Sequence, residues 1–312
     1  MQWTDRIGRR LKPRDLHVFL TVAEQGNMAK AAERLAISRP VISKTIADLE
    51  QTLAVKLLDR TPRGVEPTIY GRALLKRTVA VFDELRESVK EIEFLSDPNA
   101  GELRIGCTEV MASGFVSAVI EKMLGKHPNL VFRMELGSAP TLQFQLLPER
   151  KCELVIARQL NPGDQSELDA EVLFYEKLVV AAGPRNKWQS GRRVTLADLA
   201  DERWILTRLE TEPGSPVFEA FQACGLPVPR ARILSESVNL RNCLLAAGRF
   251  VTIIPESILR FGPERRLFQV LPIRIPRWRL PIAIMTLKNR TLSPAAQRFI
   301  TMARELAKTV RA

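Results

Sequence analysis

A short segment, SRPVISK at 38–44, brings hydroxyl and cationic side chains together within two helical turns. An arginine such as Arg39 can donate two parallel hydrogen bonds to O6 and N7 of guanine, and serine hydroxyls can bond base edges or phosphates. A lysine such as Lys44 neutralises phosphate charge. Ser38, Arg39, Ser43 and Lys44 are therefore candidate contacts to a nucleic acid, provided that one exposed surface presents them.

The residue types that most often ligate metals or act as nucleophiles are sparse. The chain has four cysteines, at 107, 152, 224 and 243, and two histidines, at 17 and 127. No two cysteines form a CxxC pair, so we expect reduced thiols and neither a disulfide framework nor a zinc site. His17 falls on a predicted helix and His127 at a predicted helix end, where surface or capping roles are favoured over metal ligation.

Motifs typical of several enzyme classes are absent. The sequence contains no P-loop, GxGxxG, GxSxG or HExxH, so the usual phosphate-binding, nucleophile and metallohydrolase signatures are missing. A nucleophilic cysteine stays open on composition alone, as does an oxidant-sensing role for Cys107 or Cys243. We favour structural thiols, and we expect no enzymatic activity, no metal and no cofactor.

Three short helices are predicted to position the 38–44 segment, at 13–25, 28–35 and 39–52. Gly26 ends the first helix, Asn27 can cap the second and Ser38 can cap the third. In the third helix apolar residues recur at i, i+4, i+7 and i+11, namely Ile42, Ile46, Leu49 and Leu53. This stripe must face inward, so we expect the polar residues at the helix start to face solvent.

A short helix, a tight turn and a longer helix form the helix–turn–helix pattern, in which the second helix enters the major groove of DNA. An ordinary three-helix bundle with a polar outer face would show the same periodicity, so that interpretation stays open. Residues 55–67 add a predicted β-hairpin. Arg60 and Arg63 lie at its tip, where a wing reaches the DNA backbone or minor groove; a solvated basic loop is the alternative.

A long helix is predicted at 69–96, capped by Thr68 and ended before Pro98. Its apolar residues recur with the heptad spacing of a coiled coil, most simply for pairing with a second copy of the chain. The expected dimerisation seam consists of Leu75, Phe82, Leu85, Val89 and Ile92.

Beyond residue 100, strands and helices alternate, which predicts an α/β fold with mainly parallel sheets. Predicted strands lie at 102–107, 130–136, 153–157, 178–183, 203–207, 250–254 and 281–287. Helices are expected at 111–126 and 139–150. The length of this region and the polar stretch at 158–170 fit two lobes with a cleft between them.

Length and charge bound these interpretations. With 312 residues and 35.2 kDa, the chain has room for two or three domains. The net charge of +12 suits a nucleic-acid partner, but residues 260–312 hold 12 basic and 2 acidic side chains and so carry most of the excess. We favour a solvated surface for that basic region; extra phosphate contact or docking on an acidic partner is the alternative.

Hydropathy excludes a membrane role. No apolar run is long enough to cross a bilayer, and the N-terminus has no apolar segment after its basic residues. We therefore expect a cytoplasmic protein with no membrane partner.

Several segments together carry a family resemblance. They are FLTVAEQG, AAERL, SRPVISKTIADLE and KLLDRTPRGVEPT within 16–71, then GELRIG at 101–106, Gly-Ser at 137–138, ELVIA at 153–157, and LLAAG and IIPES within 244–257. With these segments the chain resembles LysR-type transcriptional regulators over nearly its whole length, most specifically in its first seventy residues.

The resemblance implies a multidomain α and α/β chain: a winged helix-turn-helix, a long linker helix, and a two-lobed α/β effector domain of the type 2 periplasmic-binding-protein fold. The implied domains are 1–68 for DNA binding, 69–98 for the linker and dimerisation helix, and 99–312 for the effector domain, with lobe I at about 100–160 and 268–312 and lobe II at about 161–267. Such proteins bind double-stranded promoter DNA, usually as homotetramers (dimers of dimers), and RNA polymerase is a further expected partner.

The resemblance carries the DNA-binding role to seven positions: Ser38, Arg39, Pro40, Ser43, Lys44, Arg60 and Arg63. Position 39 is commonly Gln in the family, so Arg39 departs from the pattern and predicts a preference for guanine. Ala54 and Pro62 stand where Gly is common, and Phe250 where Gly is frequent. We expect these three to change the local backbone and not the fold.

In such proteins a small-molecule effector sits between the lobes at the carboxyl ends of strands. The candidate effector-binding residues here are Thr108, Glu109, Ser138, Ala139, Thr207 and Arg208. Many effectors of such proteins are small organic acids, so the resemblance implies one here, and the helix N-terminus after Thr108 would attract an anion. Glu109 would repel a carboxylate and Arg208 would attract one. Loop capping is the alternative role for these Thr and Ser residues.

Taken alone, residues 100–312 would also suit a solute-binding protein. The helix–turn–helix and the absence of a signal segment argue against that interpretation. We therefore expect a regulator whose promoter binding or bending is modulated by a small molecule held between two lobes.

Overall fold

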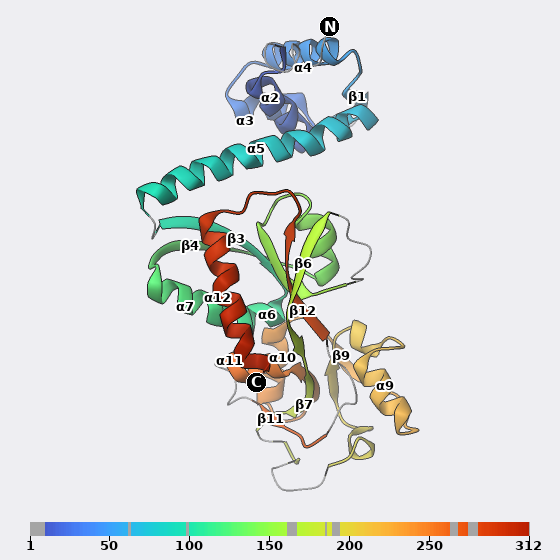
Figure 1. Ribbon diagram of the computed structural model, residues 1–312. Helices are drawn as coiled ribbons and strands as arrows, with labels where there is room; N and C mark the ends of the chain where they lie inside the picture. The colour runs from blue at the N-terminus through green and yellow to red at the C-terminus, as the bar shows by residue number, and fades with distance from the viewer. Residues whose placement is uncertain are drawn as a thin grey trace. The chain divides into compact units, whose positions relative to one another are not determined.

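A computed structural model describes residues 10–61, 64–97, 100–160, 167–184, 186–188, 194–262, 268–273 and 280–311 (Figure 1). The chain forms two compact units, Met1–Val89 and Lys90–Ala312. The boundary between them falls inside α5 (Ile69–Ser96), a helix that therefore contributes to both units.

Three helices open the first unit where their caps predict them: α2 (Pro13–Gln25), α3 (Met28–Leu35) and α4 (Arg39–Leu53). Gly26 ends α2 in the left-handed conformation, with φ of 59°. The Asn27 side chain accepts hydrogen bonds from the backbone N–H groups of Ala29 and Lys30 and so caps α3. Ser38 has the extended backbone of an N-cap, but its hydroxyl makes no capping hydrogen bond, contrary to expectation.

The apolar stripe of α4 faces the core of this unit. Ile42, Ile46 and Leu49 are buried, and they share one hydrophobic cluster with Phe19 of α2 and Ala31 of α3. Because Ala31 is small and fully buried, neighbouring helices can approach closely there. Burying this stripe fixes the rotation of α4 about its own axis.

A β-hairpin follows, formed by β1 (Leu58–Thr61) and β2 (Gly64–Pro67), which pair antiparallel. Its two sides are tied to the helices: the Val65 N–H donates to the Gly26 carbonyl at 2.9 Å, and Glu50 Oε1 accepts from the Leu57 N–H at 2.9 Å. Although burial raises the pKa of Glu50, hydrogen bonds from Lys56 and from the backbone lower it below its ordinary value.

Thr68 begins α5 in the predicted way. Its Oγ1 accepts from the Gly71 N–H at 3.0 Å and donates to the Lys56 carbonyl at 2.7 Å. At Gly71 a Cβ would lie 2.0 Å from the Leu57 carbonyl oxygen, so only glycine allows α5 to pass this close to the segment that leads into the hairpin.

Two mixed β-sheets are described in the second unit, with strand orders β4-β3-β5-β12-β6 and β11-β7-β10-β8-β9 (Figure 1). The strands of the first are β3 (Ala100–Cys107), β4 (Asn129–Leu136), β5 (Leu154–Arg158), β6 (Leu168–Glu176) and β12 (Leu280–Leu287). Those of the second are β7 (Leu178–Ala182), β8 (Trp204–Leu206), β9 (Ala231–Leu234), β10 (Val251–Pro255) and β11 (Gln269–Val270). Each sheet with its helices forms one lobe.

Helical segments cover both faces of each sheet. In the first lobe α7 (Ser117–Lys126) and α12 (Pro294–Arg311) pack on one face, and η2 (Leu142–Leu146) packs on the other. In the second lobe α9 (Pro216–Ala223) covers one face, while α10 (Val238–Ala246) and α11 (Glu256–Phe261) cover the other. This layering confirms the α/β architecture expected for the region. The expectation of mainly parallel sheets was wrong, because β12 pairs antiparallel with β5 and β6, and β7 pairs antiparallel with β10 and β11.

The helix predicted at 111–126 is built from three consecutive segments: α6 (Glu109–Met111), η1 (Ala112–Val116) and α7. The helix predicted at 139–150 is α8 (Ala139–Thr141) followed by η2. Both η1 and η2 are wide π-helical turns. Such turns are rare in proteins as a whole, and those that occur are often found near functional sites.

Three strands, β6, β9 and β11, were not predicted, and two of them move the expected lobe boundaries. β6 belongs to the first sheet although 161–267 is the range expected for lobe II, and β11 pairs with β7 in the second sheet although 268–312 is expected in lobe I. The third is the edge strand β9. β6 is also an edge strand, and its opening residues, LDAE, continue a polar stretch. Its partner, β12, lies far along the chain, so local pattern gives no sign of the pairing.

Ala54 generates a stability prediction. It ends α4 in the left-handed conformation, with φ of 57°, and is exposed. A side chain in that conformation costs about 1 kcal/mol, which glycine avoids. We expect Ala54→Gly to raise the free energy of unfolding by about 0.5–1 kcal/mol, measured by scanning calorimetry.

Ala47 supplies the matched control. It is exposed in the interior of the same helix, where Ala→Gly lowers stability by about 1 kcal/mol. Equal destabilisation by both substitutions would show that the left-handed residue carries no strain.

Candidate functional sites

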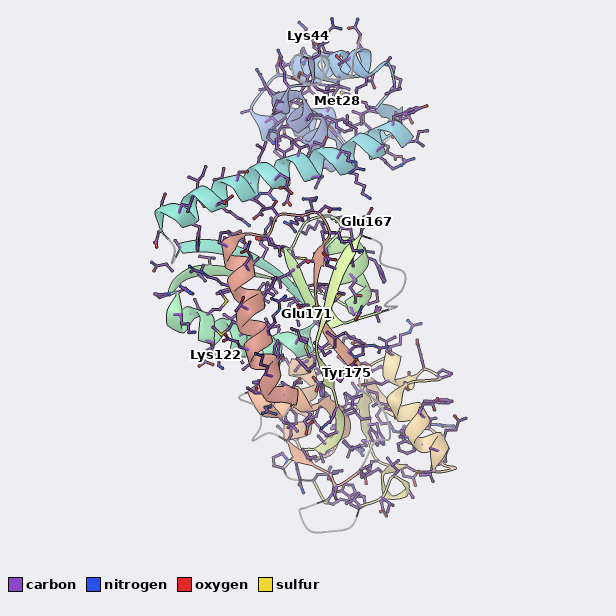
Figure 2. The ribbon with its side chains drawn as sticks, in the orientation of Figure 1. Met28, Lys44, Lys122, Glu167, Glu171 and Tyr175 are labelled. Atoms are coloured by element: carbon purple, nitrogen blue, oxygen red, sulfur yellow. The ribbon has the colours of Figure 1, made fainter. Side chains whose placement is uncertain are left out.

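The leading turn of α4 is exposed. Ser38, Arg39, Pro40 and Lys44 are all exposed, and Figure 2 shows Lys44 projecting outward from the helix. Ser43 is different: it is half-buried, and its hydroxyl donates to the Met28 sulfur at 3.6 Å. Four of the five sequence-predicted residues on this helix therefore share one open surface, while Ser43 turns toward α3.

This surface is cationic and unengaged. Within the described residues, neither Arg39 nor Lys44 has an ion pair or hydrogen bond for its side chain. The helix N-terminus adds backbone N–H groups and the positive end of the helix dipole. One turn beyond Lys44, however, the exposed Asp48 would oppose a phosphate. The chemistry available at this end is hydrogen bonding to base edges and contact with phosphates, confined to the leading turn.

The wing is present as a hairpin, but neither of its two arginine side chains lies within the described part of the chain. Arg60 lies on β1 opposite Val65, and its side chain is outside the described part of the chain. Arg63 is also outside the described residues. Their role as wing contacts stays a prediction.

The expected seam on α5 divides into two parts. Leu75 packs against the core of the first unit, and Phe82 is half-buried with its ring 5.5 Å from that of His17. Leu85, Val89 and Ile92 are instead exposed, Leu85 at 50% and Ile92 at 64%. Only the second group forms an apolar stripe open to another chain.

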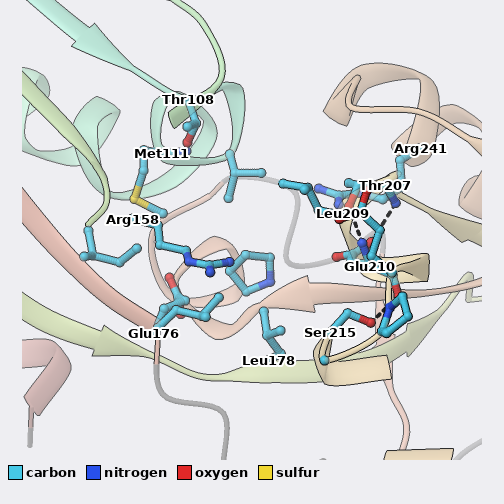
Figure 3. Close-up of a pocket in the computed structure, with 17 residues that line it drawn as sticks. Thr108, Met111, Arg158, Glu176, Leu178, Thr207, Leu209, Glu210, Ser215 and Arg241 are labelled. Carbon is cyan, nitrogen blue, oxygen red and sulfur yellow. Dashed lines mark hydrogen bonds between the residues drawn. The ribbon is translucent and has the colours of Figure 1, made fainter. Parts of the chain in front are cut away.

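A cavity of about 320 Å³ lies between the two lobes of the second unit, a size at the lower end for small-molecule sites. The first lobe contributes Thr108, Val110, Met111, Arg158, Glu176, Leu280 and Ile282. The second contributes Leu178, Thr207, Leu209, Glu210, Glu212, Pro213, Gly214, Ser215, Arg241 and Pro255. In Figure 3, Arg158 and Glu176 lie on one side, with Thr207, Glu210 and Arg241 together on the other.

Two of the three carboxylates in the cavity wall, Glu176 and Glu210, are already held by hydrogen bonds, and the third, Glu212, is exposed. Glu176 is 2% exposed and accepts from the Ser257 N–H at 3.1 Å and from the Ser257 hydroxyl at 2.5 Å. Glu210 accepts from the Thr207 N–H at 2.7 Å. Burial raises the pKa of both carboxyl groups, although these hydrogen bonds, and the charge of Arg241 for Glu210, act in the opposite direction. Their negative charge is therefore less available to a ligand than the composition of the wall suggests.

Arg158 is the exposed cation of the cavity. It is the last residue of β5, and its backbone carbonyl accepts from Gln143 Nε2 at 2.8 Å, which fixes the end of the strand. Arg241, by contrast, is 6% exposed and lies near Glu210. Of the two arginines that line the cavity, Arg158 is therefore the one accessible to a ligand.

The structure brings together two of the six residues expected to bind an effector. Thr108 and Thr207 line the cavity; Glu109, Ser138, Ala139 and Arg208 do not. Ser138 caps α8 through the Thr141 N–H at 3.3 Å, and Arg208 is exposed.

Sequence reasoning missed Arg158, although a charged residue ending the buried run ELVIA was a usable signal. It also missed Glu176, Glu210 and Arg241, for which only tertiary packing gives a signal.

The cysteines divide by burial. Burial raises the pKa of Cys107 to about 12 and that of Cys152 to about 11, so both are held as thiols, which are poor nucleophiles. Cys224 and Cys243 are exposed.

Within the described ranges, no group of His, Cys, Asp and Glu could hold a metal ion. No described helix has the length and hydropathy to cross a membrane.

A helix–turn–helix with an exposed leading turn, joined by a long helix to a two-lobed unit with an interlobe cavity, defines a class of ligand-responsive DNA-binding proteins. Comparison with known families agrees. The family "Bacterial regulatory helix-turn-helix protein, lysR family" matches residues 13–72, and "LysR substrate binding domain" matches residues 96–308. The chain belongs to the LysR family of DNA-binding transcriptional regulators, in which the second domain serves a small-molecule effector.

Individual relatives support the assignment along the whole chain. The chain is 30% identical to the transcriptional regulator GbpR of Azospirillum brasilense over 96% of this chain and 88% of that protein. It is 26% identical to the transcriptional dual regulator GltC of Bacillus subtilis over 92% and 94%. The crystal structure of CbnR, a LysR family regulator, has the same fold, with a TM-score of 0.62 at 23% identity over 95% of this chain and 99% of that one.

Proposed function

We propose that this regulator reads promoter DNA by inserting the leading turn of α4 into the major groove. Arg39 donates to a guanine edge, Lys44 contacts phosphate, and Ser38 and Pro40 complete the surface. The carrying observation is that this turn is exposed and that its two cations have no partner within the described residues. Arg60 and Arg63 add contacts from the wing to the backbone or minor groove.

Two substitutions separate base reading from phosphate contact. Arg39→Ala should relax the preference at one base pair and cost about 1–3 kcal/mol on the best site, whereas Lys44→Ala should weaken all sites alike and lower the salt slope by about 1. Sites are selected from random duplexes with the protein itself, and affinity is measured by fluorescence anisotropy against salt.

Lys122 gives the control, because it is an exposed lysine of α7 in the other unit; Lys122→Ala should bind like the wild type. If Arg39→Ala keeps the full base preference, Arg39 does not read the sequence.

We also propose that the exposed stripe of α5 pairs with the same stripe of a second copy, and that two such dimers form the expected tetramer. Leu85, Val89 and Ile92 repeat at heptad spacing on an otherwise charged surface. Leaving them in water would expose a continuous apolar stripe, which pairing removes.

The double variant Leu85→Glu/Ile92→Glu should dissociate this dimer, because it buries carboxylates in an apolar seam. Sedimentation velocity at micromolar concentration measures the mass of the full chain. Glu91→Lys, at an exposed α5 position away from the stripe, should leave the mass unchanged. An unchanged mass for the double variant would place the dimer contact elsewhere. Leu75 is unsuitable for this test because it packs in the core of its own unit.

For the interlobe cavity we propose a small organic acid as the effector. Arg158 would meet its acidic group, Thr108 and Thr207 would supply polar contacts, and the aliphatic wall would cover its apolar part. Glu176 and Glu210 are already engaged by hydrogen bonds from the protein, so the exposed Arg158 offers the acidic group a direct partner, whereas the exposed Glu212 would oppose it. Binding there would bias the lobes and thereby the promoter complex and its contact with RNA polymerase.

A panel of short monocarboxylates and neutral polyols, each added at millimolar concentration, tests the ligand class by thermal shift. Acids that fit should raise the melting temperature of the wild type, and Arg158→Gln should abolish that rise. Arg208→Gln, an exposed arginine outside the cavity, should retain it. Stabilisation by polyols alone would overturn the organic-acid assignment while leaving the cavity as the site.

A further inference from the structure

The chain crosses between the two lobes twice, from β6 to β7 and again from β11 to β12, and the first of these connections is short. β6 ends at Glu176 in the first sheet and β7 begins at Leu178 in the second, so only Lys177 lies between them. A one-residue connection lets the lobes rotate about it but allows little separation. The angle between the lobes must therefore be set by contacts on either side of this connection.

One such contact is made by Glu176 itself. Its carboxylate accepts both the N–H and the hydroxyl of Ser257, which is 1% exposed in the first turn of α11. The next residue reinforces the contact, because the Lys177 carbonyl accepts from the Glu256 N–H at 2.8 Å. α11 follows directly from β10 of the second sheet, so the first lobe holds this helix by its amino-terminal turn.

Close backbone packing accompanies the Glu176 contact. A Cβ on Gly262, which follows α11, would lie 3.1 Å from the Ser113 carbonyl oxygen, and one on Gly114 would lie 3.4 Å from the Ser257 carbonyl oxygen. The π-helical turn η1 of the first lobe therefore meets α11 of the second with almost no side chain between them. A small rotation of the lobes would therefore change the distance between Glu176 and Ser257 directly.

A second carboxylate makes the corresponding contact at α10. Glu109 Oε1 accepts from the Asn239 N–H at 3.4 Å, in the first turn of that helix. Glu109 follows the cavity residue Thr108, and α10 carries the cavity residue Arg241. Two carboxylates of the first lobe thus accept hydrogen bonds from the amino-terminal turns of two helices of the second lobe, where the helix dipole favours negative charge.

We propose that Glu176 and Glu109 are positioning residues that set the angle between the lobes around the cavity. Glu176 belongs at once to the cavity wall and to the contact with α11, so a ligand placed against it also acts on the lobe angle. Glu109 positions α10 and, through it, Arg241. This inference rests on the cavity being the effector site, but the lobe angle can be measured without any effector.

The alternative is that Glu176 is only a buried structural group. Removing it would then lower stability without changing the lobe angle. Glu176→Ala deletes both hydrogen bonds, whereas Glu176→Gln keeps the shape and can still accept one hydrogen bond from Ser257 and donate the other. Glu256→Gln is the matched control, because Glu256 is the neighbouring acidic residue and only faces the exposed Lys177 at 3.8 Å.

The lobe angle is followed in the full chain by the distance between two spin labels. One label uses the native exposed Cys224 of the second lobe, and the other uses Glu121→Cys on α7 of the first, with Cys243→Ser as background. Labelled chains are diluted into unlabelled protein so that distances within one chain dominate. The buried thiols of Cys107 and Cys152 stay unlabelled because of their raised pKa.

We expect Glu176→Ala to shift or broaden the distance distribution, and Glu176→Gln and Glu256→Gln to match the wild type. Amide exchange of Ser257 should quicken by about tenfold in Glu176→Ala, because a hydrogen bond to a charged group is lost. Glu109→Ala should do the same at Asn239.

A wild-type distance distribution in a folded Glu176→Ala protein overturns the proposal for Glu176. If Glu176→Ala does not fold, Ser257→Ala and Glu109→Ala carry the test, and unchanged distances in both overturn it. Loss of the thermal shift with acids while these distances still respond would instead count against the proposed effector site alone.

Discussion

The burial of one apolar stripe on α4 underlies the DNA-binding unit. Ile42, Ile46 and Leu49 can enter the core only if the helix is rotated so that its opposite side faces solvent. That rotation exposes Arg39 and Lys44 without any further interaction to hold them outward. The segment before the hairpin is then tied to α4 by the hydrogen bond from the Leu57 N–H to the Glu50 carboxylate, and the start of α5 is tied to that segment by the bond from the Thr68 hydroxyl to the Lys56 carbonyl. A rigid scaffold with a cationic helix end is the result.

The effector unit meets a different constraint, which is the cost of burying charge. A carboxylate taken out of water needs hydrogen bonds to replace its hydration. Glu176 and Glu210 obtain them from Ser257 and Thr207, at the beginnings of short helical segments. These two carboxylates are thereby satisfied within the protein, while the exposed Arg158 keeps its guanidinium accessible to a ligand.

Local signals explain what the sequence predicts well. Helix limits in the first unit follow from caps and stops within a few residues, such as Asn27, Gly26 and Thr68, and these act without tertiary help. The strands of the α/β region are likewise found where short apolar runs lie between polar segments. The Ser38 hydroxyl is the local signal that failed, since the residue takes the N-cap backbone without the capping bond.

Features that depend on distant pairing were less predictable. β6 is defined by its ladder with β12, and the cavity gathers Arg158, Glu176 and Arg241 from segments well separated in the chain. The heptad pattern of α5 identified its apolar residues but could not separate those that pack within the chain from those that stay exposed. Leu75 and Phe82 pack within the first unit. Periodicity states which residues share a helix face, and only packing decides which neighbour covers it.

Communication between DNA reading and effector binding must use α5, because this helix belongs to both units. Its last turns are fastened within the second unit: Lys90 forms an ion pair with the buried Glu153 beside β5, and Arg298 of α12 stacks over the Phe94 ring at 4.5 Å. Because β5 ends at Arg158, the strand that presents the cavity cation also adjoins the anchor of the helix. A continuous hydrogen-bonded helix resists bending over such a length. The last turns of α5 and the strand that ends at Arg158 are therefore held by one set of contacts, while the first turns of the same helix pack in the DNA-binding unit.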